Sequence, residues 1–155
     1  MALALLLASC GSCKSIQSGT TGTVPQQQGK VFKILVWNIQ NGMWSDQGNN
    51  YDNFVKFVRM VSDEHGLNIS QRNMTVSTCG LVPEILKLAE EQLQITLALS
   101  LHGSTQEKRK ALMPIAFKYP LDEVLKACDT YFEKTGRRIT FEYSLAQGVN
   151  DSEED

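Results

Sequence analysis

The feature that most constrains the fold is a regular alternation of short strand patterns and amphipathic helix patterns in the last hundred residues. Residues 74–78, 95–100 and 138–145 read as strands, and apolar side chains recur at helical spacing before and between them. Pro83 stands at an expected first helical position, and Gly136 follows the last helical pattern. Strands that alternate with helices of this length predict parallel βαβ units, so we expect an α/β fold with helices packed on a parallel sheet.

The ends of the expected helices have their own signals. One helix begins behind Asn50 and Asp52 and ends near Gly66, and the word Ser104-Thr105-Gln106-Glu107 has the spacing of a capping box that opens another. At the end of the chain, Asn150 followed by acidic residues predicts a further helix start, with a solvated acidic tail as the alternative. We prefer the helix start, because a third strand in such a series normally leads into a helix, and we therefore expect a truncated piece.

Charge is distributed unevenly along the chain. The 155 residues are 42% hydrophobic and 21% charged with a net charge of −2, which suits one ordinary domain and argues against an overall basic surface for nucleic acid. No apolar run reaches the ~18–20 residues that a spanning helix needs. Residues 1–50 have a net charge of +2 and residues 51–155 a net charge of −4. This difference predicts two segments of different origin that meet near residue 50.

Residues 1–29 are expected to be a lipoprotein-like signal followed by a flexible tether. Residues 1–8 are small and apolar, and Leu7-Ala8-Ser9-Cys10 resembles a bacterial lipoprotein signal in which Cys10 is acylated and anchors the chain to a membrane. An apolar start without targeting value is the alternative, because no basic residue precedes the run. Residues 11–29 are rich in Ser, Gly, Thr and Gln, as in a flexible tether, which makes a redox role of the pair Cys10 and Cys13 unexpected.

Residues 30–50 are expected to contain one isolated strand at residues 33–39. The string from Ile34 to Gly42 resembles the opening strand of the endonuclease/exonuclease/phosphatase superfamily, with the likeness covering about residues 30–58. The resemblance implies that Asn38 helps to hold a metal or a phosphate. The other metal-binding and catalytic elements of that superfamily have no counterparts in this sequence, so a plain core strand with a polar end is the preferred interpretation.

Residues 51–155 resemble a second family, through several words at consistent spacing. They are similar to the bacterial radical S-adenosylmethionine methyltransferases that modify C2 of adenine in 23S ribosomal RNA and transfer RNA. The matching words are Gly66 to Ile69, Thr75 to Pro83, Leu97 to His102, Arg109 to Ile115, Lys118 to Leu121, Thr135 to Tyr143 and Gly148 to Ser152. The resemblance implies a partial (β/α) barrel, S-adenosyl-L-methionine and a [4Fe–4S] cluster as cofactors, and ribosomal and transfer RNA as partners.

The same resemblance places four residues in the cofactor site. It implies that Ser77 and the run Ser100, Leu101 and His102 contact S-adenosylmethionine, at the carboxyl ends of two strands where ligands bind in parallel α/β folds. A serine and a backbone run can hydrogen-bond the ribose, the amino acid portion or the adenine edge. As structural alternatives, Ser77 satisfies a turn amide and His102 is a capped loop histidine.

The cysteines do not have the spacing of a radical cluster site. Three thiolates spaced C-x-x-x-C-x-x-C hold such a cluster, and Cys10, Cys13, Cys79 and Cys128 include no such triple. We therefore expect no cluster in this chain, and we assign no catalytic residue and no metal ligand. Cys79 and Cys128 are expected to be packing residues. The cysteine that becomes the methyl carrier in this family is expected beyond Asp155.

Three functional hypotheses follow from the sequence. The first is a fragment of a radical S-adenosylmethionine RNA methyltransferase that is inactive alone. The others are a remnant of a lipid-anchored hydrolase and a chimeric reading frame without function. The methyltransferase resemblance predicts the cytoplasm, whereas the signal-like segment predicts a membrane lipoprotein. A sheet cut from a barrel leaves apolar edges uncovered, so we expect the isolated fragment to aggregate or oligomerise.

Overall fold

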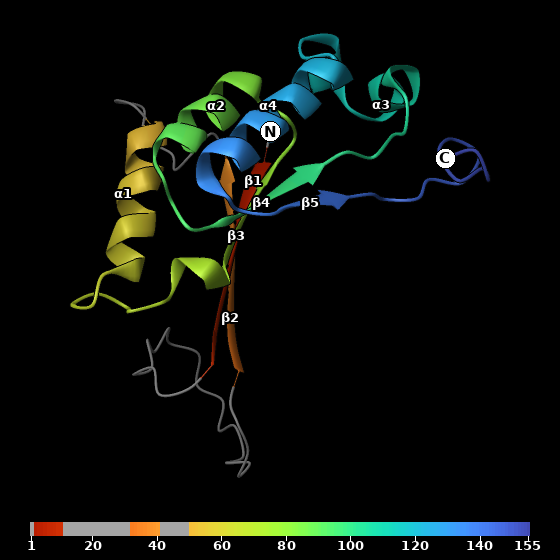
Figure 1. Cartoon of the computed structure of the whole chain (residues 1–155). Coiled ribbons are helices and arrows are strands. Elements are labelled where there is room, and N and C mark those ends of the chain that lie inside the picture. The colour runs from red at the N-terminus through yellow and green to blue at the C-terminus, as the bar shows by residue number, and fades with distance from the viewer. Residues whose placement is uncertain (1, 11–31, 41–49) are drawn as a thin grey trace, which may run out of the picture.

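The computed structural model describes the backbone of residues 2–10, 32–40 and 50–155 and the side chains of residues 51–155. Strands and helices alternate in the second half of the chain, as the sequence predicts (Figure 1). The strands are β1 (Ala2–Cys10), β2 (Phe32–Gln40), β3 (Met74–Thr78), β4 (Thr96–Ser100) and β5 (Ile139–Glu142). The α-helices are α1 (Asn50–Ser62), α2 (Val82–Glu90), α3 (Gln106–Leu112) and α4 (Leu121–Thr135), and two short 3-10 helices cover Gln71–Asn73 and Pro114–Phe117.

These strands form one sheet with the order β2-β1-β3-β4-β5. Strands β3, β4 and β5 pair in parallel, which confirms the predicted α/β fold with a parallel sheet. Strand β1 pairs antiparallel with both β2 and β3. Residues 2–10, which the sequence analysis assigned to a signal-like run, form β1, and the strand predicted at 33–39 is paired rather than isolated. The physical reason is that β3 has an open edge, which the backbone of an extended segment can satisfy. The flexible tether predicted at residues 11–29 lies outside the described residues.

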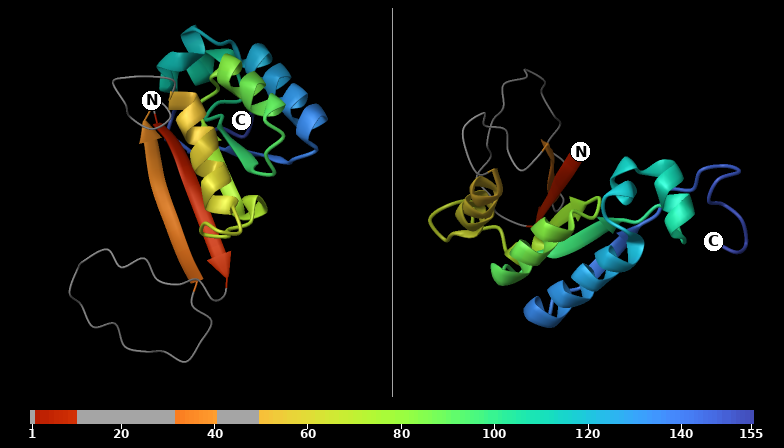
Figure 2. Two further views of the ribbon diagram at one scale, coloured as in Figure 1. Left: turned by 90° about the vertical axis from the view of Figure 1, so that its left-hand side faces the viewer. Right: turned by 90° about the horizontal axis from the view of Figure 1, so that it is seen from above.

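The helices lie on one side of β3, β4 and β5. Helices α2 and α4 run side by side over the parallel strands, and α1 lies at the side near β3 (Figure 2). Exposure alternates along β3, where Met74, Val76 and Thr78 are buried and the residues between them are half-buried. Val76 and Leu97 belong to the same apolar cluster as the buried side chains of the three helices. Each fully buried Leu or Ile contributes about 1.5–3 kcal/mol, so this one-sided core holds the layer together.

The helix ends follow local signals, but α1 ends at Ser62 rather than near Gly66, and α3 also differs from prediction. Gly136 ends α4 with a φ of 63°, the left-handed conformation that favours glycine. Helix α3 begins one residue later than the predicted capping box, because Thr105 rather than Ser104 accepts the hydrogen bond from the Lys108 amide at 3.3 Å. The Ser104 hydroxyl instead donates to Asp155 at 2.8 Å.

The chain after β5 turns back on itself. Strand β5 is shorter than the predicted 138–145, and the residues that follow form a loop with turns around 147–149. The prediction that Asn150 starts a helix is wrong for the described residues. Asn150 is fully buried, and its amide bonds the preceding loop instead of capping a helix.

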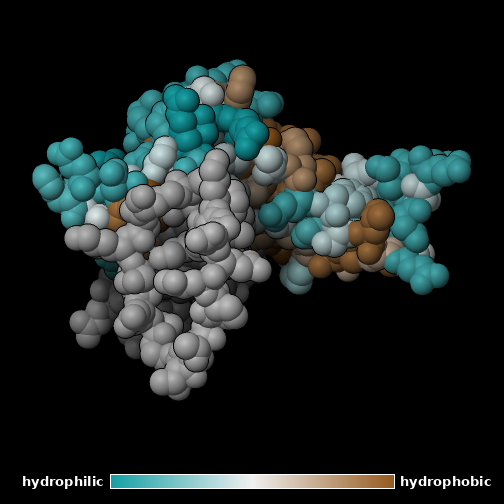
Figure 3. Space-filling view, turned by 90° about the horizontal axis from the view of Figure 1, so that it is seen from below, coloured by the Kyte–Doolittle hydropathy of each residue, from teal (hydrophilic) through white to brown (hydrophobic). Residues whose placement is uncertain are grey.

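The exposed surface includes large apolar side chains on β5 and in the loop that follows it. Phe141 is 54% exposed and Leu145 is 75% exposed. The aggregation or oligomerisation expected from the uncovered edges of the sheet stays a prediction. From the side opposite the helices, the described surface shows a hydrophobic region beside a paler, more polar one towards the C-terminal end (Figure 3). Within the described stretches, no helix combines the length and the apolar character needed to cross a membrane.

Candidate functional site

The face of the parallel strands that carries no helix presents mostly small side chains, many of which have a hydroxyl group. Successive side chains of a strand point to opposite faces, and Val76, Leu97 and Leu99 point into the helix-covered core. The strand pairing aligns Thr75 with Thr96, and Ser100 with Glu142. The positions that alternate onto the other face are Thr75, Ser77, Thr96, Ala98, Ser100, Thr140 and Glu142. Small polar side chains offer hydrogen bonds, which suits a polar ligand.

Three of these residues meet at the carboxyl ends of the strands. The Ser77 hydroxyl on β3 donates to Oε2 of Glu142 on β5 at 2.7 Å, and the Ser100 hydroxyl on β4 donates to the same oxygen at 2.9 Å. We call Ser77, Ser100 and Glu142 the strand-end cluster. The structure thus brings the two predicted serines together, and it adds a carboxylate to which the sequence analysis assigned no role. The sequence signals for Glu142 are its place in the third predicted strand and in the matching word Thr135 to Tyr143.

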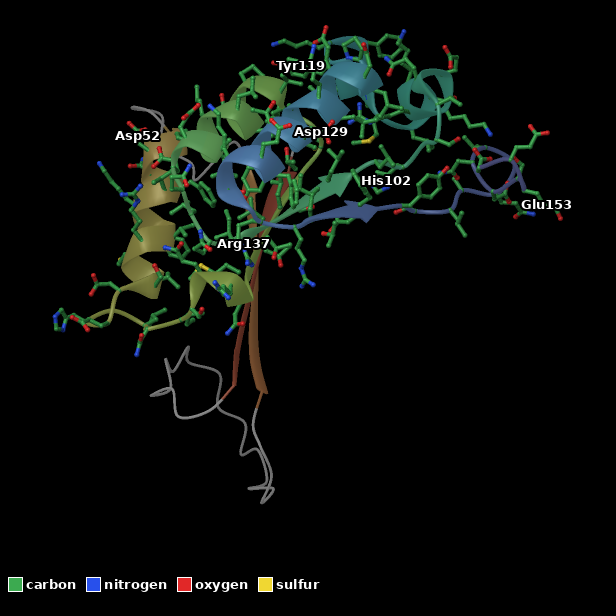
Figure 4. The ribbon with its side chains drawn as sticks, in the orientation of Figure 1. Asp52, His102, Tyr119, Asp129, Arg137 and Glu153 are labelled. Atoms are coloured by element: carbon green, nitrogen blue, oxygen red, sulfur yellow. The ribbon has the colours of Figure 1, made fainter. Side chains whose placement is uncertain are left out.

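The predicted residues Leu101 and His102 form a turn that is bound to β5. The Leu101 and His102 amides donate to the backbone oxygen of Glu142 at 2.9 and 3.3 Å. His102 has a φ of 53°, a strained value for a residue with a side chain. Its Nδ1 accepts a hydrogen bond from the Ser144 amide at 3.1 Å, so the neutral ring has its proton on Nε2. In Figure 4 His102 lies just past β4, away from Tyr119 and Asp129 in the helical layer.

Asn150 ties this turn to the loop after β5. Its Nδ2 donates to the backbone oxygens of His102 and Ser144 at 2.8 and 2.9 Å, and its Oδ1 accepts from the Ala146 amide at 2.6 Å. We call these three hydrogen bonds the Asn150 latch. The backbone oxygen of Asn150 also accepts from the Tyr143 hydroxyl at 3.3 Å. The side-chain amide of Asn150 is buried and fully hydrogen-bonded. It therefore helps to hold His102 in its positive-φ conformation, which is unfavourable for a residue with a side chain.

A buried arginine supports the strand ends from the helical side. Arg109 on α3 is fully buried, and its Nη2 donates to the backbone oxygen of Cys79 at 2.6 Å. Its Nε and Nη1 have no hydrogen-bond partner among the described residues. Burial lowers the pKa of Arg109. The loops that contain Gly80 and Gly103 both lie close to Arg109. A Cβ added to Gly80 would lie 2.9 Å from Nη2 of Arg109, and a Cβ added to Gly103 would lie 2.7 Å from the Arg109 backbone nitrogen.

The described residues do not fit a [4Fe–4S] cluster. Among the side chains of residues 51–155, no group of three or more His, Cys, Asp or Glu is placed to hold a metal. Burial raises the pKa of the Cys79 thiol, and burial together with Asp129 raises the pKa of Cys128 to about 11. Cluster ligands are thiolates, whereas these two thiols stay protonated near neutral pH. Their environment agrees with packing roles.

The side chains of three residues singled out in the sequence analysis lie outside the part of the chain that the structure describes. Asn38, the basis of the hydrolase hypothesis, belongs to β2, and Cys10, the predicted site of acylation, belongs to β1. The side chains of both residues lie outside the described part of the chain, as does all of Cys13. The structure therefore adds nothing to the metal, lipid or redox hypotheses for these positions.

Comparison with known proteins places the chain beside RNA methyltransferases. No family model matches the sequence. A "Probable dual-specificity RNA methyltransferase RlmN" of Lachnoclostridium phytofermentans is 64% identical over 151 residues, covering 92% of this chain and 42% of the relative. A protein of the same description from Clostridium perfringens strain 13 is 49% identical over 154 residues, covering 94% of this chain and 44% of the relative. The chain thus spans less than half the length of these relatives.

A solved structure shows the same fold over part of the chain. The crystal structure of a radical SAM methyltransferase from Sphaerobacter thermophilus superposes with a TM-score of 0.64 and 47% sequence identity, over 68% of this chain and 31% of that chain. The match to the Clostridium perfringens relative covers a larger share of this chain than residues 51–155 make up. Similarity to these relatives therefore extends into the first fifty residues, and the boundary predicted near residue 50 stays a prediction.

Proposed function

We propose, from the premise that this chain corresponds to part of the RlmN family of radical S-adenosylmethionine RNA methyltransferases, that its strand ends form part of an S-adenosylmethionine site. The residues proposed to contact the cofactor are Ser77, Ser100, Leu101 and His102. The observation that supports the proposal is their convergence. Ser77 and Ser100 share one carboxylate oxygen, and the Leu101–His102 turn is bound to the backbone of the same residue.

The chemistry of the site suits a nucleoside with polar substituents. The serines and the carboxylate recognise hydroxyl or amino groups, and the bound turn offers His102 Nε2 as a hydrogen-bond donor. This edge is also where ligands bind in parallel α/β sheets, at the carboxyl ends of the strands.

The activity of the whole family protein is proposed more broadly. We infer that a complete protein containing this segment methylates C2 of adenine in 23S ribosomal RNA and transfer RNA in the cytoplasm, with S-adenosylmethionine and a [4Fe–4S] cluster. The similarity to probable dual-specificity RNA methyltransferases supports the class of reaction and of substrate. No catalytic step is assigned to the described residues, because they do not fit the cluster.

We further propose that the 155-residue polypeptide does not complete methyl transfer by itself. Its four cysteines include no triple with the spacing that holds a radical cluster. Anaerobic reconstitution with iron and sulfide tests this proposal, and we expect no stoichiometric visible absorbance of a [4Fe–4S] cluster. A stoichiometric cluster signal that depends on Cys10 and Cys13 would overturn it.

Ligand-induced stabilisation tests the cofactor site itself. We expect millimolar S-adenosylmethionine to raise the melting temperature of the full chain, because a ligand at ten times its Kd stabilises by about 1.4 kcal/mol. Ser77→Ala should reduce this shift, whereas Ser70→Ala, at an exposed position that caps no helix through its side chain, should leave it unchanged. No shift in the wild-type chain at millimolar ligand would contradict the proposed site.

A further inference from the structure

Glu142 is a carboxylate held in place without a cationic partner. Its Oε2 accepts from the hydroxyls of Ser77 and Ser100, at 2.7 and 2.9 Å. Within the described residues its Oε1 accepts no hydrogen bond, and no Lys, Arg or His forms an ion pair with it. The residue is exposed, so this oxygen is accessible from solvent. A carboxylate that is oriented by two neighbours and open on one side is prepared to accept further hydrogen bonds.

The strand-end cluster presents only acceptors to a ligand. Each serine uses its single hydroxyl proton in the bond to Glu142, so each serine oxygen is left with lone pairs. A cluster of this kind selects a group that has several O–H or N–H donors and no negative charge. Hydrogen bonds to an ionised acceptor are roughly twice as strong as neutral ones, so the carboxylate dominates the selection.

The place of Glu142 in the fold favours the sugar of a nucleoside as that group. Its backbone oxygen binds the Leu101 and His102 amides, so its side chain lies next to the turn that is proposed to contact the cofactor. Vicinal ribose hydroxyls supply two donors at adjacent carbons, and a carboxylate at a strand end is the usual acceptor for a ribose hydroxyl in dinucleotide sites. An ammonium group that pairs with an exposed carboxylate gains little binding free energy, because water screens the ion pair.

We propose that Glu142 binds the ribose hydroxyls of the nucleoside cofactor, with Ser77 and Ser100 orienting its carboxylate. This inference rests on the proposed function, because it requires a nucleoside at the same strand ends. It assigns a ligand contact to a residue that the family resemblance did not place in the site, and it names the part of the cofactor that the residue recognises.

Calorimetric titration of the full chain tests the assignment. The probes are S-adenosylmethionine, 5′-methylthioadenosine, which keeps the ribose and lacks the amino acid portion, and 2′-deoxy-5′-methylthioadenosine. The variant Glu142→Gln keeps the shape of the side chain and removes its charge. Glu133→Gln, at an exposed position on α4, is the matched control for a change of one charge. Urea unfolding of each variant shows whether the fold is retained.

The affinities of the three probes for the wild-type chain and for Glu142→Gln separate the proposed cofactor site from the proposed ribose contact of Glu142. Glu142→Gln should weaken S-adenosylmethionine and 5′-methylthioadenosine by the same factor, on the order of tenfold. The wild-type chain should bind the 2′-deoxy analogue more weakly than 5′-methylthioadenosine, and this difference should nearly vanish in Glu142→Gln, since the deleted hydroxyl and the deleted charge belong to one interaction.

Other outcomes overturn the inference in distinct ways. Unchanged affinities in Glu142→Gln would show that the carboxylate does not contact the ligand, although the proposed cofactor site would stand. A loss confined to S-adenosylmethionine would assign Glu142 to the amino acid portion instead of the ribose. If no probe binds the wild-type chain, both the cofactor site and the role of Glu142 are refuted for this polypeptide.

Discussion

The Asn150 latch offers the sharpest test of how the loop after β5 is stabilised. Asn150→Ala removes two hydrogen bonds donated to backbone oxygens and one accepted from a backbone amide. Each such bond contributes about 0.5–1.5 kcal/mol, and the partners are left unsatisfied in a partly buried loop. We therefore expect a loss of about 2–4 kcal/mol in the free energy of unfolding.

Asn150→Asp should make the free energy of unfolding depend on pH. The variant keeps the oxygen that accepts from Ala146, but it places a second oxygen against the carbonyls of His102 and Ser144, where the native amide donates at 2.8 and 2.9 Å. Burial and these two carbonyls disfavour the charged form, so the pKa of the new carboxyl is raised in the folded state. The folded variant then binds more protons than the unfolded chain, and its stability falls as pH rises above the unfolded value of about 3.9.

Urea unfolding followed by circular dichroism at pH 7.5 and at pH 4.5 measures this effect. Asn150→Asp should be destabilised at pH 7.5 at least as much as Asn150→Ala, and its deficit relative to wild type should shrink at pH 4.5. Asn73→Asp, at an exposed position, is the control for the same substitution and should change stability by less than about 0.5 kcal/mol. A deficit of Asn150→Asp that is small at pH 7.5, or equal at both pH values, would refute the reasoning.

Three further predictions concern the strand ends and the C-terminal residues. Gly80→Ala should destabilise the fold by about 1–3 kcal/mol in urea unfolding. Gly80 has a φ of 95°, and the added Cβ would lie 2.9 Å from Arg109 and 3.0 Å from Val124. An unchanged free energy of unfolding would contradict this close packing. Arg109→Met should be more stable than Arg109→Ala by about 2 kcal/mol, since methionine keeps most of the buried volume, and equal stabilities would show that packing is not the main role of the side chain. Lys108 and two serine hydroxyls lower the pKa of Asp155 well below its usual range, so the stabilisation should be present above the ordinary pKa of 3.8 and lost as pH falls below it. Asp155→Asn should therefore flatten the acid limb of the pH–stability curve, and an unchanged limb would refute that contribution.

Local patterns predicted the helices and parallel strands well, because their signals lie within a few residues. Apolar spacing with Pro83 and Gly136 at the helix ends predicted α2 and α4, and the observed helices begin and end beside these residues. The capping box illustrates the limit of local reasoning. Ser104 and Thr105 are both acceptable caps, and the contact of Ser104 with Asp155, which lies 51 residues away, accompanies the start of the helix at Thr105.

Long-range pairing explains where the prediction failed. The run Ala2–Cys10 has the composition of a signal and also that of a strand, and pairing with β2 and with the open edge of β3 places it in the sheet. Asn150 has the side chain of a helix cap, yet its amide is used by the turn at His102, 48 residues earlier in the chain. Such partners cannot be read from neighbouring residues, because short polar side chains bond whichever backbone groups the fold brings near them.

The sequence by itself determined the order of strands and helices in the last hundred residues and the family likeness, because apolar periodicity and short motifs are properties of local segments. It also named the two serines and the Leu101–His102 turn. Only the tertiary structure decided that Glu142 joins them, since its partners lie 65 and 42 residues away and meet it through the register of three parallel strands. Register depends on backbone pairing across the sheet, and that pairing places one carboxylate between two hydroxyls at the edge where a ligand can enter.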